Sequence, residues 1–211
     1  MSSGTTPATE SAPGHALLTD LYELTMAAAA WKAGRTEDEA VFHLYFRRLP
    51  FQGGFAVAAG LGPALEEISR FRFGPDELEA LRGIGAPGGG SLFPEGFLDW
   101  LSRLSLTIDV DAIPEGTVVF PNEPLLRVSG PLVEAQILES LLLNIVNFQT
   151  LVATKSARIR IAAEGDPVLE FGLRRAQGVD GALAASRAAY VGGAAATSNV
   201  LAGARYGIPV R

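Results

Sequence analysis

The order of strand-like and helix-like segments from Val168 to Arg211 constrains the fold more than any other feature of the chain. This region alternates a short apolar strand, a small-residue helix, a second short strand, a helix that ends at Gly207, and a final IPVR segment. Such β-α-β-α-β alternation is typical of parallel α/β folds. We therefore predict that a parallel α/β unit begins here. A complete βα barrel needs roughly 250 residues, so we expect this chain to be a fragment of a longer protein.

The region before this unit has a different pattern, which predicts helices packed on an antiparallel sheet. A helix is expected from Leu17 to Ala33, with Asp20 and Glu23 forming a capping box at its start. In the segment 41–47, alternation predicts a strand that buries Phe42, Leu44 and Phe46. Further strands are expected within residues 106–111, 117–120 and 125–128, separated by the turn sequences IPEG and PNEP.

The longest apolar stretch, from Pro131 to Ala163, predicts a long helix and the start of a second domain. Polar residues interrupt the stretch throughout, so we predict no membrane span. The expected organisation is a disordered tail at residues 1–14, an N-terminal α/β domain at 15–129, and a helical linker with the first βα units at 130–211.

Composition excludes several classes of function. The absence of cysteine excludes disulfides and thiolate chemistry, and a net charge of −6 leaves no broad basic surface for nucleic acid. The two histidines, His15 and His43, are too separated to suggest a metal site. Residues 1–14 lack the charged and apolar regions of a signal peptide, so we expect a cytoplasmic protein.

Two segments offer candidate site residues. The motif LEFGLRRAQG (169–178) places Arg174 and Arg175 after a predicted strand, at the edge where parallel α/β folds bind ligands. Paired guanidinium groups there can bind a carboxylate or phosphate, although a solvated arginine pair on a loop fits the same spacing. Tyr22, close to Asp20 on the first predicted helix, is interpreted from its spacing as a core or subunit contact.

Six segments together resemble the nicotinate phosphoribosyltransferase family, in order and with the expected gaps. They are LLTDLYELTM (17–26), FRRLPFQGGFAVAAGL (46–61), VDAIPEGTVVFPNEPLLRVSGPL (110–132), LLNIVNFQTLVATKSARI (142–159), EFGLRRAQGVDG (170–181) and TSNVLAGARYGIPV (197–210). The resemblance implies an α/β sandwich domain followed by an irregular α/β barrel, incomplete in this chain, in a homodimer. It also implies a transferase of the glycosyltransferase and ligase type. Such an enzyme joins nicotinate to phosphoribosyl pyrophosphate and forms nicotinate mononucleotide for NAD biosynthesis. The reaction uses magnesium and is coupled to ATP hydrolysis.

The resemblance also implies roles for individual residues. Phe171 matches the aromatic that stacks on the pyridine ring, and Tyr22 matches the aromatic that a neighbouring subunit lays on the ring's other face. Arg174 and Arg175 match arginines that bind the nicotinate and phosphoribosyl groups. Ser198 matches the position where nicotinamide-using relatives carry an aspartate, so it favours the acid over the amide.

The resemblance further places the family's phosphorylated histidine directly after IPVR, beyond residue 211, so no catalytic residue is assigned in this chain. We therefore expect the fragment itself to be inactive. Two other hypotheses stay open: a non-catalytic remnant that binds ligand or caps a dimer, and a nicotinamide or quinolinate phosphoribosyltransferase.

Overall fold

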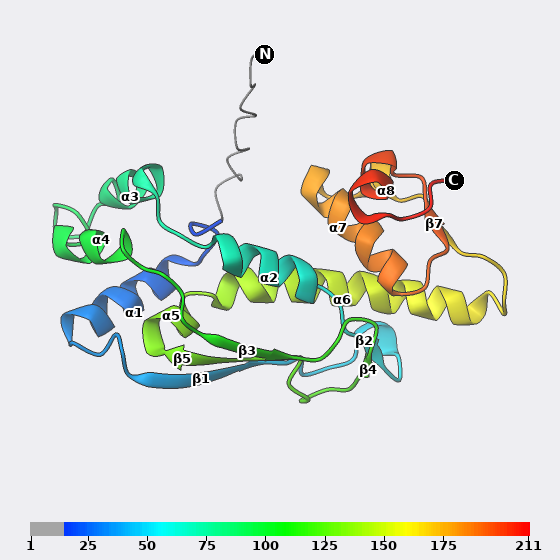
Figure 1. The fold of residues 1–211 in the computed structure, drawn as a ribbon, viewed down its shortest axis with the longest axis horizontal. Helices are drawn as coiled ribbons and strands as arrows, with labels where there is room; N and C mark the ends of the chain where they lie inside the picture. The colour runs from blue at the N-terminus through cyan, green and yellow to red at the C-terminus, as the bar shows by residue number, and fades with distance from the viewer. Residues whose placement is uncertain (1–14) are drawn as a thin grey trace, which may run out of the picture.

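The computed structural model describes residues 15–211, so the tail expected at residues 1–14 lies outside the described residues. Helices and short strands are mixed along the chain (Figure 1). In order, the elements are α1 (Leu21–Lys32), β1 (Glu39–Leu44), the 3-10 turn η1 (Pro50–Gln52), β2 (Ala56–Val57), α2 (Leu61–Arg70), α3 (Pro75–Arg82), α4 (Glu95–Leu101), β3 (Asp109–Ala112), β4 (Val118–Val119), β5 (Leu126–Pro131), α5 (Leu132–Gln136), α6 (Glu139–Ala162), β6 (Leu169–Glu170), the 3-10 turn η2 (Leu173–Arg175), α7 (Gly178–Val191), β7 (Ala196–Thr197) and α8 (Val200–Tyr206).

An antiparallel sheet organises the N-terminal region, as the sequence predicts. Its strand order is β1-β5-β3, and β2 pairs with β4 in a second small ladder. Leu126 and Val128 on the central strand β5 are buried, whereas Phe42, which lies opposite Val128 on the edge strand β1, stays 39% exposed. The predicted buried face of residues 41–47 is therefore only partly covered, because an edge strand has a neighbour on one side alone.

Aromatic side chains fill the core between this sheet and the N-terminal helices. Phe97 is fully buried, and its ring centroid lies 5.9 Å from Trp31, 5.7 Å from Phe93 and 6.0 Å from Trp100. Tilted and offset contacts at these separations add to the stabilisation from burial alone. The cluster joins α1 to α4, two helices that are distant in sequence.

The long helix α6 lies at the centre of the fold. Its 24 residues give it a length of about 36 Å, with the sheet on one side and α7 and α8 on the other (Figure 1). The polar residues predicted along it have packing roles: Val57 N–H donates to Thr154 Oγ1 at 2.9 Å, and Ala59 N–H donates to Thr150 Oγ1 at 3.3 Å. These bonds hold β2 against the helix.

By length and composition, Leu132–Ala162 is the one stretch of the described chain apolar enough to cross a membrane. Half of its most apolar window is buried against the rest of the fold. The core helix of a globular protein has the same length and hydropathy, so these properties are weak evidence for a membrane span.

The start of α1 differs from the prediction. Asp20 is the N-cap residue, but its side chain makes no capping bond, and Glu23 is fully buried instead of closing a capping box. The Glu23 carboxylate accepts hydrogen bonds from Thr19 Oγ1 at 2.7 Å and from Ser140 N–H at 3.1 Å. The free N–H groups at the start of α6 therefore attract this carboxylate away from its own helix end.

The C-terminal region forms the predicted parallel unit. β6 pairs with β7 in parallel, and Thr197 forms a parallel bridge with Val210. Gly207 ends α8 with a positive φ of 67°, as the glycine at that position predicts. The β-α-β-α-β order is thus confirmed. The predicted domain division at 129/130 falls inside β5, and α6 contacts both regions.

A half-buried ion pair joins the two regions. The Glu115 carboxylate, in the IPEG turn, meets the Arg187 guanidinium of α7 at 2.6 Å and also accepts the Gly60 N–H at 2.6 Å. Burial alone would raise the pKa of Glu115, but the hydrogen bonds from Arg187, Gly60 and Gly62 outweigh it and lower the pKa. The hydrogen bond to Glu115 raises the pKa of Arg187. Both side chains are therefore charged at neutral pH.

Candidate functional site

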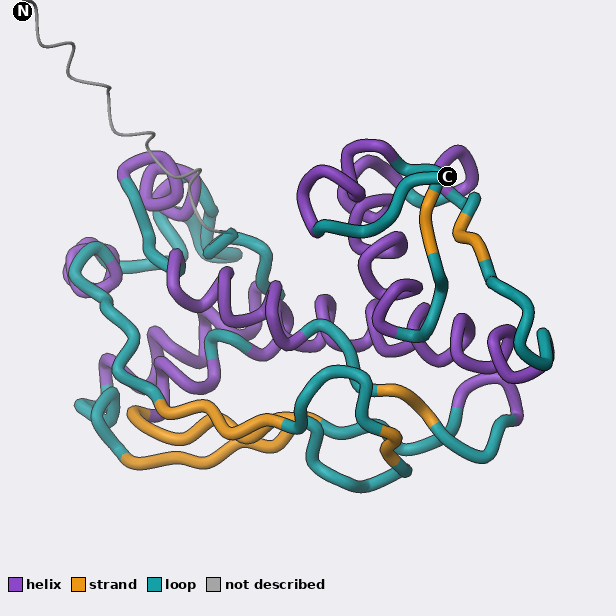
Figure 2. Tube along the Cα trace, turned by 45° about the vertical axis from the view of Figure 1, so that its right-hand side comes forward, coloured by secondary structure: helices purple, strands orange, loops and turns teal. Residues whose placement is uncertain are grey.

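Phe171 and Ser198 lie side by side at the carboxyl ends of β6 and β7. The register pairs Glu170 with Thr197, so the next residue of each strand follows at the same edge. Ser198 N–H donates to the Glu170 carbonyl oxygen at 2.9 Å and extends the pairing by one step. Figure 2 shows the two strands together near the C-terminus. The structure thus brings together two residues that are 27 positions apart in sequence.

The turn η2, which follows β6, places Arg174 and Arg175 at the same edge. Gly172 follows Phe171 directly, and its carbonyl oxygen accepts the Arg175 N–H at 2.8 Å, which closes the turn. Both arginine side chains are exposed, and neither forms an ion pair with any residue in the range 15–211. Two guanidinium groups beside an exposed aromatic ring can bind an anionic ligand that also stacks.

Beneath this edge lies a polar network that the sequence reasoning missed. The Glu170 carboxylate accepts hydrogen bonds from Thr197 Oγ1 at 2.6 Å and from Ser186 Oγ at 2.8 Å, and also from the Gly172 N–H. Asn199 Nδ2 donates to Ser186 Oγ at 3.2 Å. One feature of the sequence could have indicated this network, namely a glutamate, Glu170, between the apolar residues Leu169 and Phe171.

Tyr22 lies apart from the other predicted site residues. Near the start of α6, Ser140 contacts α1, whereas Ser156 contacts α7 through the Ala189 carbonyl at 2.8 Å. The helix rises by about 24 Å from Ser140 to Ser156. Within one chain, Tyr22 on α1 is therefore not brought to Phe171, Arg174, Arg175 or Ser198.

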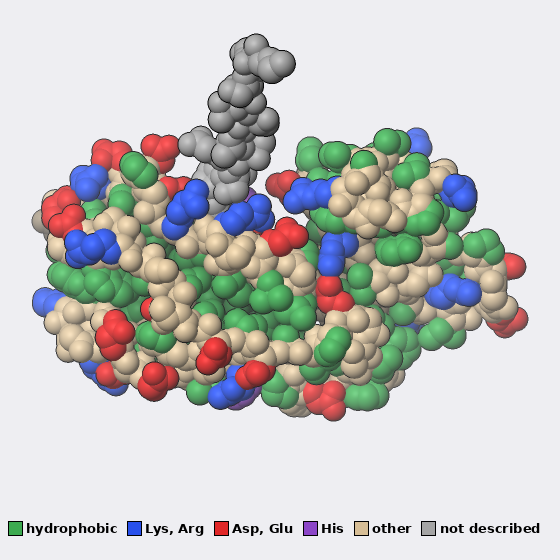
Figure 3. Space-filling view, viewed as in Figure 1, with side chains coloured by type: hydrophobic (Ala, Val, Ile, Leu, Met, Phe, Trp, Pro, Cys, Tyr) green, Lys and Arg blue, Asp and Glu red, His purple; other side chains and the backbone are tan. Residues whose placement is uncertain are grey.

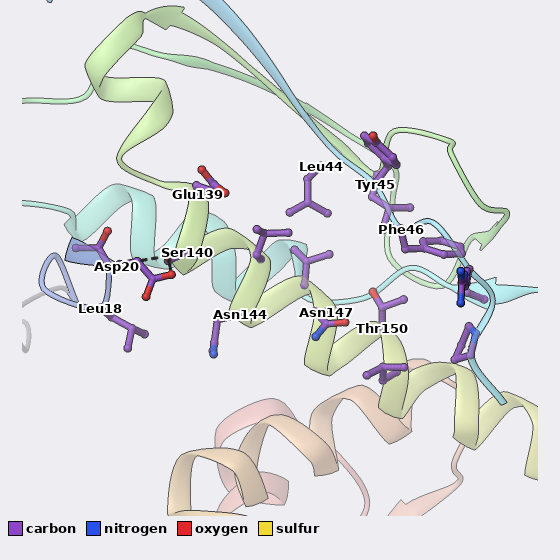
Figure 4. Close-up of a pocket in the computed structure, with 18 of the residues that line it drawn as sticks. Leu18, Asp20, Leu44, Tyr45, Phe46, Glu139, Ser140, Asn144, Asn147 and Thr150 are labelled. Carbon is purple, nitrogen blue, oxygen red and sulfur yellow. Dashed lines mark hydrogen bonds between the residues drawn. The ribbon is translucent and has the colours of Figure 1, made fainter. Parts of the chain in front are cut away.

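A groove lies beside Tyr22. Its volume is about 710 Å³, and residues of α1, β1 and α6 line it. In Figure 4, Glu139, Ser140, Asn144, Asn147 and Thr150 are placed along α6, and Leu44, Tyr45 and Phe46 follow the neighbouring strand.

The Tyr22 side chain is 46% exposed at this groove. A hydrogen bond to the Glu139 carboxylate, with smaller contributions from burial and from the charge of Glu139, raises the pKa of Tyr22 to about 12. The tyrosine hydroxyl is therefore neutral and able to donate at physiological pH.

Within the described residues, no three His, Asp or Glu side chains gather to form a metal-binding group. His15 contacts Glu67 at 2.9 Å, and His43 lies on β1.

Comparison with known proteins relates the chain to one family. A family model described as the nicotinate phosphoribosyltransferase N-terminal domain matches residues 17–147. A nicotinate phosphoribosyltransferase of Mycobacterium tuberculosis is 47% identical over 194 residues, which cover 92% of this chain and 40% of that protein. The nicotinate phosphoribosyltransferase of Dictyostelium discoideum is 50% identical over 200 residues, covering 92% of this chain and 33% of that protein. The chain therefore spans two fifths or less of the length of these relatives.

Solved structures give the same relation. The crystal structure of human nicotinic acid phosphoribosyltransferase matches with a TM-score of 0.83 and 46% identity, covering 92% of this chain and 38% of that one. A nicotinate-nucleotide pyrophosphorylase from Pyrococcus furiosus matches with a TM-score of 0.70 at 24% identity, covering all of this chain and 44% of that one. This second match shows a shared fold alone.

Proposed function

The chain belongs to the nicotinate phosphoribosyltransferase family, and on that premise we propose that the whole protein joins nicotinate to phosphoribosyl pyrophosphate. The pyridine nitrogen forms a bond to C1 of the phosphoribosyl group, the bond from C1 to the diphosphate oxygen breaks, and diphosphate leaves. The product is nicotinate mononucleotide, which would serve NAD biosynthesis in the cytoplasm. In this proposal, β6, α7, β7 and α8 begin the irregular α/β barrel that follows the N-terminal α/β sandwich domain.

The observation that carries the proposal is the juxtaposition at the carboxyl ends of β6 and β7. An exposed aromatic ring, two arginines without ion-pair partners among the described residues, and a small hydroxyl side chain converge on one parallel edge. Nicotinate is a planar, electron-poor ring with one carboxylate, and phosphoribosyl pyrophosphate is strongly anionic. An aromatic face and two guanidinium groups are the complementary chemistry.

Each residue receives a proposed role. Phe171 stacks on the pyridine ring, and Arg174 and Arg175 bind the nicotinate carboxylate and the phosphoribosyl group between them. Ser198 lies beside Phe171, so it is suited to face the ring substituent. A serine does not repel a carboxylate, whereas an aspartate would repel it and accept a hydrogen bond from an amide.

Tyr22 takes part through a second copy of the chain in this proposal. Within one chain, α1 is too far from Phe171 to complete the ring pocket, whereas a partner subunit in a homodimer can bring its own Tyr22 to the other face of the ring. Apolar side chains reach the surface over much of the face seen in Figure 3. On α1, the side chains of Leu21, Tyr22 and Met26 are 46% to 53% exposed. Exposed apolar surface of this kind supports a subunit interface.

The proposal includes magnesium and ATP because the resemblance to the family implies them. No described group of three carboxylate or histidine side chains fits a protein-built magnesium site. Magnesium that is held mainly by substrate phosphates and water needs few protein ligands.

The test uses the whole protein as it is made in the cell, which we call the native polypeptide. It is incubated with labelled nicotinate, phosphoribosyl pyrophosphate and magnesium, with and without ATP. We expect labelled nicotinate mononucleotide, with ADP released when ATP is present. Parallel reactions with nicotinamide and quinolinate serve as controls for substrate choice. No nucleotide product from nicotinate, or a product from quinolinate or nicotinamide in its place, would refute the proposal.

A further inference from the structure

Glu170 occupies a position that usually carries an apolar side chain in folds of this type. Its side chain contacts Ser186 of α7 at 2.8 Å, so it lies between the parallel strands and the helix that packs on them. Parallel strands covered by helices bury mainly apolar residues, and the α7 residues Ala182, Leu183 and Ala189 are apolar and buried. Glu170 is half-buried in this layer and loses part of its hydration, which specific hydrogen bonds must offset.

Three donors from three different elements supply those bonds. Oε2 accepts from Ser186 Oγ of α7 and, at 2.6 Å, from Thr197 Oγ1 of β7, while Oε1 accepts the N–H of Gly172 in the turn after Phe171. The two oxygens of a carboxylate have enough acceptor positions for all three donors. Glu170 thus ties the turn after β6 to both α7 and β7.

The network continues around Ser198. Asn199 N–H donates to Thr197 Oγ1 at 3.0 Å, Asn199 Nδ2 donates to Ser186 Oγ, and Asn199 Oδ1 accepts the Ala202 N–H of α8. Ser198 therefore lies between two residues that the network fixes. Since successive side chains of a strand point to opposite faces, Phe171 points away from the side on which Glu170 is bound.

We propose that Glu170 is a positioning residue, whose carboxylate fixes the turn bearing Phe171, Arg174 and Arg175 relative to the strand that leads to Ser198. The role in substrate binding rests on the proposed function. A close approach at Gly172 supports the arrangement, because a Cβ atom added there would lie 2.9 Å from Glu170 Oε1. Glycine at this position leaves room for the carboxylate to reach the backbone N–H.

The principal test is Glu170→Gln in the native polypeptide. Glutamine keeps the shape of the side chain but replaces one acceptor oxygen with a donor NH₂ group that faces other donors. We expect the KM values for nicotinate and phosphoribosyl pyrophosphate to rise about 10- to 100-fold, because small displacements of binding groups have effects of this size, with a smaller change in kcat. Backbone amide exchange in residues 171–177 should become faster.

Glu134→Gln is the matched control. Glu134 is a buried carboxylate that accepts a backbone N–H and a hydroxyl, both from Thr107, but it lies on α5, which packs on β1 and β5. It should lower the melting temperature without changing either KM or the exchange of residues 171–177. Gly172→Ala and Thr197→Val weaken the Glu170 network at single contacts, and they provide the test if Glu170→Gln does not fold.

The outcomes separate the two proposals. The positioning role would be overturned if the folded variants Glu170→Gln, Gly172→Ala and Thr197→Val all matched Glu134→Gln. In that case the KM values and the amide exchange of residues 171–177 would be unchanged. Faster exchange in these variants, with no nicotinate mononucleotide formed by the unmodified protein, would support the positioning of the turn while removing the proposed function. Faster exchange together with raised KM values would support both.

Discussion

Replacing Glu115 with glutamine removes the negative charge that joins the N-terminal region to α7. The carboxylate contacts Arg187 at 2.6 Å and 2.8 Å through two oxygens, and it also accepts the Gly60 N–H just before α2. Arg187 would keep its hydrogen bond to Gln149 Oε1 at 3.1 Å and could donate to the amide oxygen of the new glutamine, but it would lose its opposite charge. The substitution leaves the volume of the side chain unchanged, so it reports on charge and hydrogen bonding.

The magnitude follows from burial. Removing one partner of a buried ion pair costs about 3–5 kcal/mol. The Glu115 and Arg187 side chains keep 20% and 19% exposure, which places this pair at the lower end, about 3 kcal/mol. For a folding unit of about 150–250 residues that loss lowers Tm by about 6–12 °C, and in a longer chain the shift is smaller.

The assay is chemical and thermal unfolding of the native polypeptide and of Glu115→Gln between pH 3 and pH 8. The folded pKa of Glu115 is lowered, so its ionised form contributes stability above its unfolded pKa of about 4.3. This contribution is lost as the pH falls through the folded value. The difference between the two proteins should therefore be greatest near neutral pH and shrink below about pH 4.

Asp111→Asn provides the matched control, because Asp111 and Arg127 form a pair at 2.7 Å whose side chains are 70% and 43% exposed. An exposed pair contributes less than about 1 kcal/mol. Equal losses of stability in Glu115→Gln and Asp111→Asn, or a Glu115→Gln loss that does not vary with pH, would refute the argument from burial.

Three further predictions concern the candidate site. Ser198→Asp should lower the ratio of kcat/KM for nicotinate to that for nicotinamide by at least about 10-fold, since a carboxylate repels the acid and accepts from the amide; an unchanged ratio would show that Ser198 does not face the ring substituent. Arg174→Ala and Arg175→Ala should each lower kcat/KM about 10- to 150-fold, which corresponds to about 1.5–3 kcal/mol, while Tm stays near the unmodified value because both side chains are exposed; wild-type kinetics in both variants would identify them as solvated surface residues. Glu139→Gln should bring the pKa of Tyr22 from about 12 back toward its ordinary value of about 10, as followed by NMR titration of the tyrosine ring; a pKa that stays near 12 would exclude Glu139 as the cause.

Local sequence patterns predicted several elements because their determinants lie within a few residues of one another. Gly207 ends α8 as expected, because a glycine takes the positive φ of a helix end without strain. The alternation after Val168 predicted parallel pairing, which the β6–β7 register confirms. Strand ends were less predictable, since β6 and β7 are paired over two residues each and their limits depend on a neighbouring strand.

Contacts between distant segments were outside the reach of such patterns. Glu23 has the spacing of a capping residue, but the N-terminal turn of α6, 117 positions away, binds its carboxylate. Alternation gave Phe42 a buried position, and the place of β1 at the sheet edge left it exposed. In the first case a tertiary partner competes with the local preference and prevails, and in the second the lack of a neighbour on one side leaves the predicted face uncovered.

The candidate site divides in the same way. The sequence by itself determined the chemistry available, an aromatic, two arginines and a serine after predicted strands, because residue type and strand position are local properties. Only the tertiary structure decided that Phe171 and Ser198 are neighbours, that Tyr22 is held apart by the length of α6, and that Glu170 joins the strands to α7. Parallel pairing and helix packing bring together residues separated by 16 to 27 positions, and no local pattern specifies which side chains meet across such a gap.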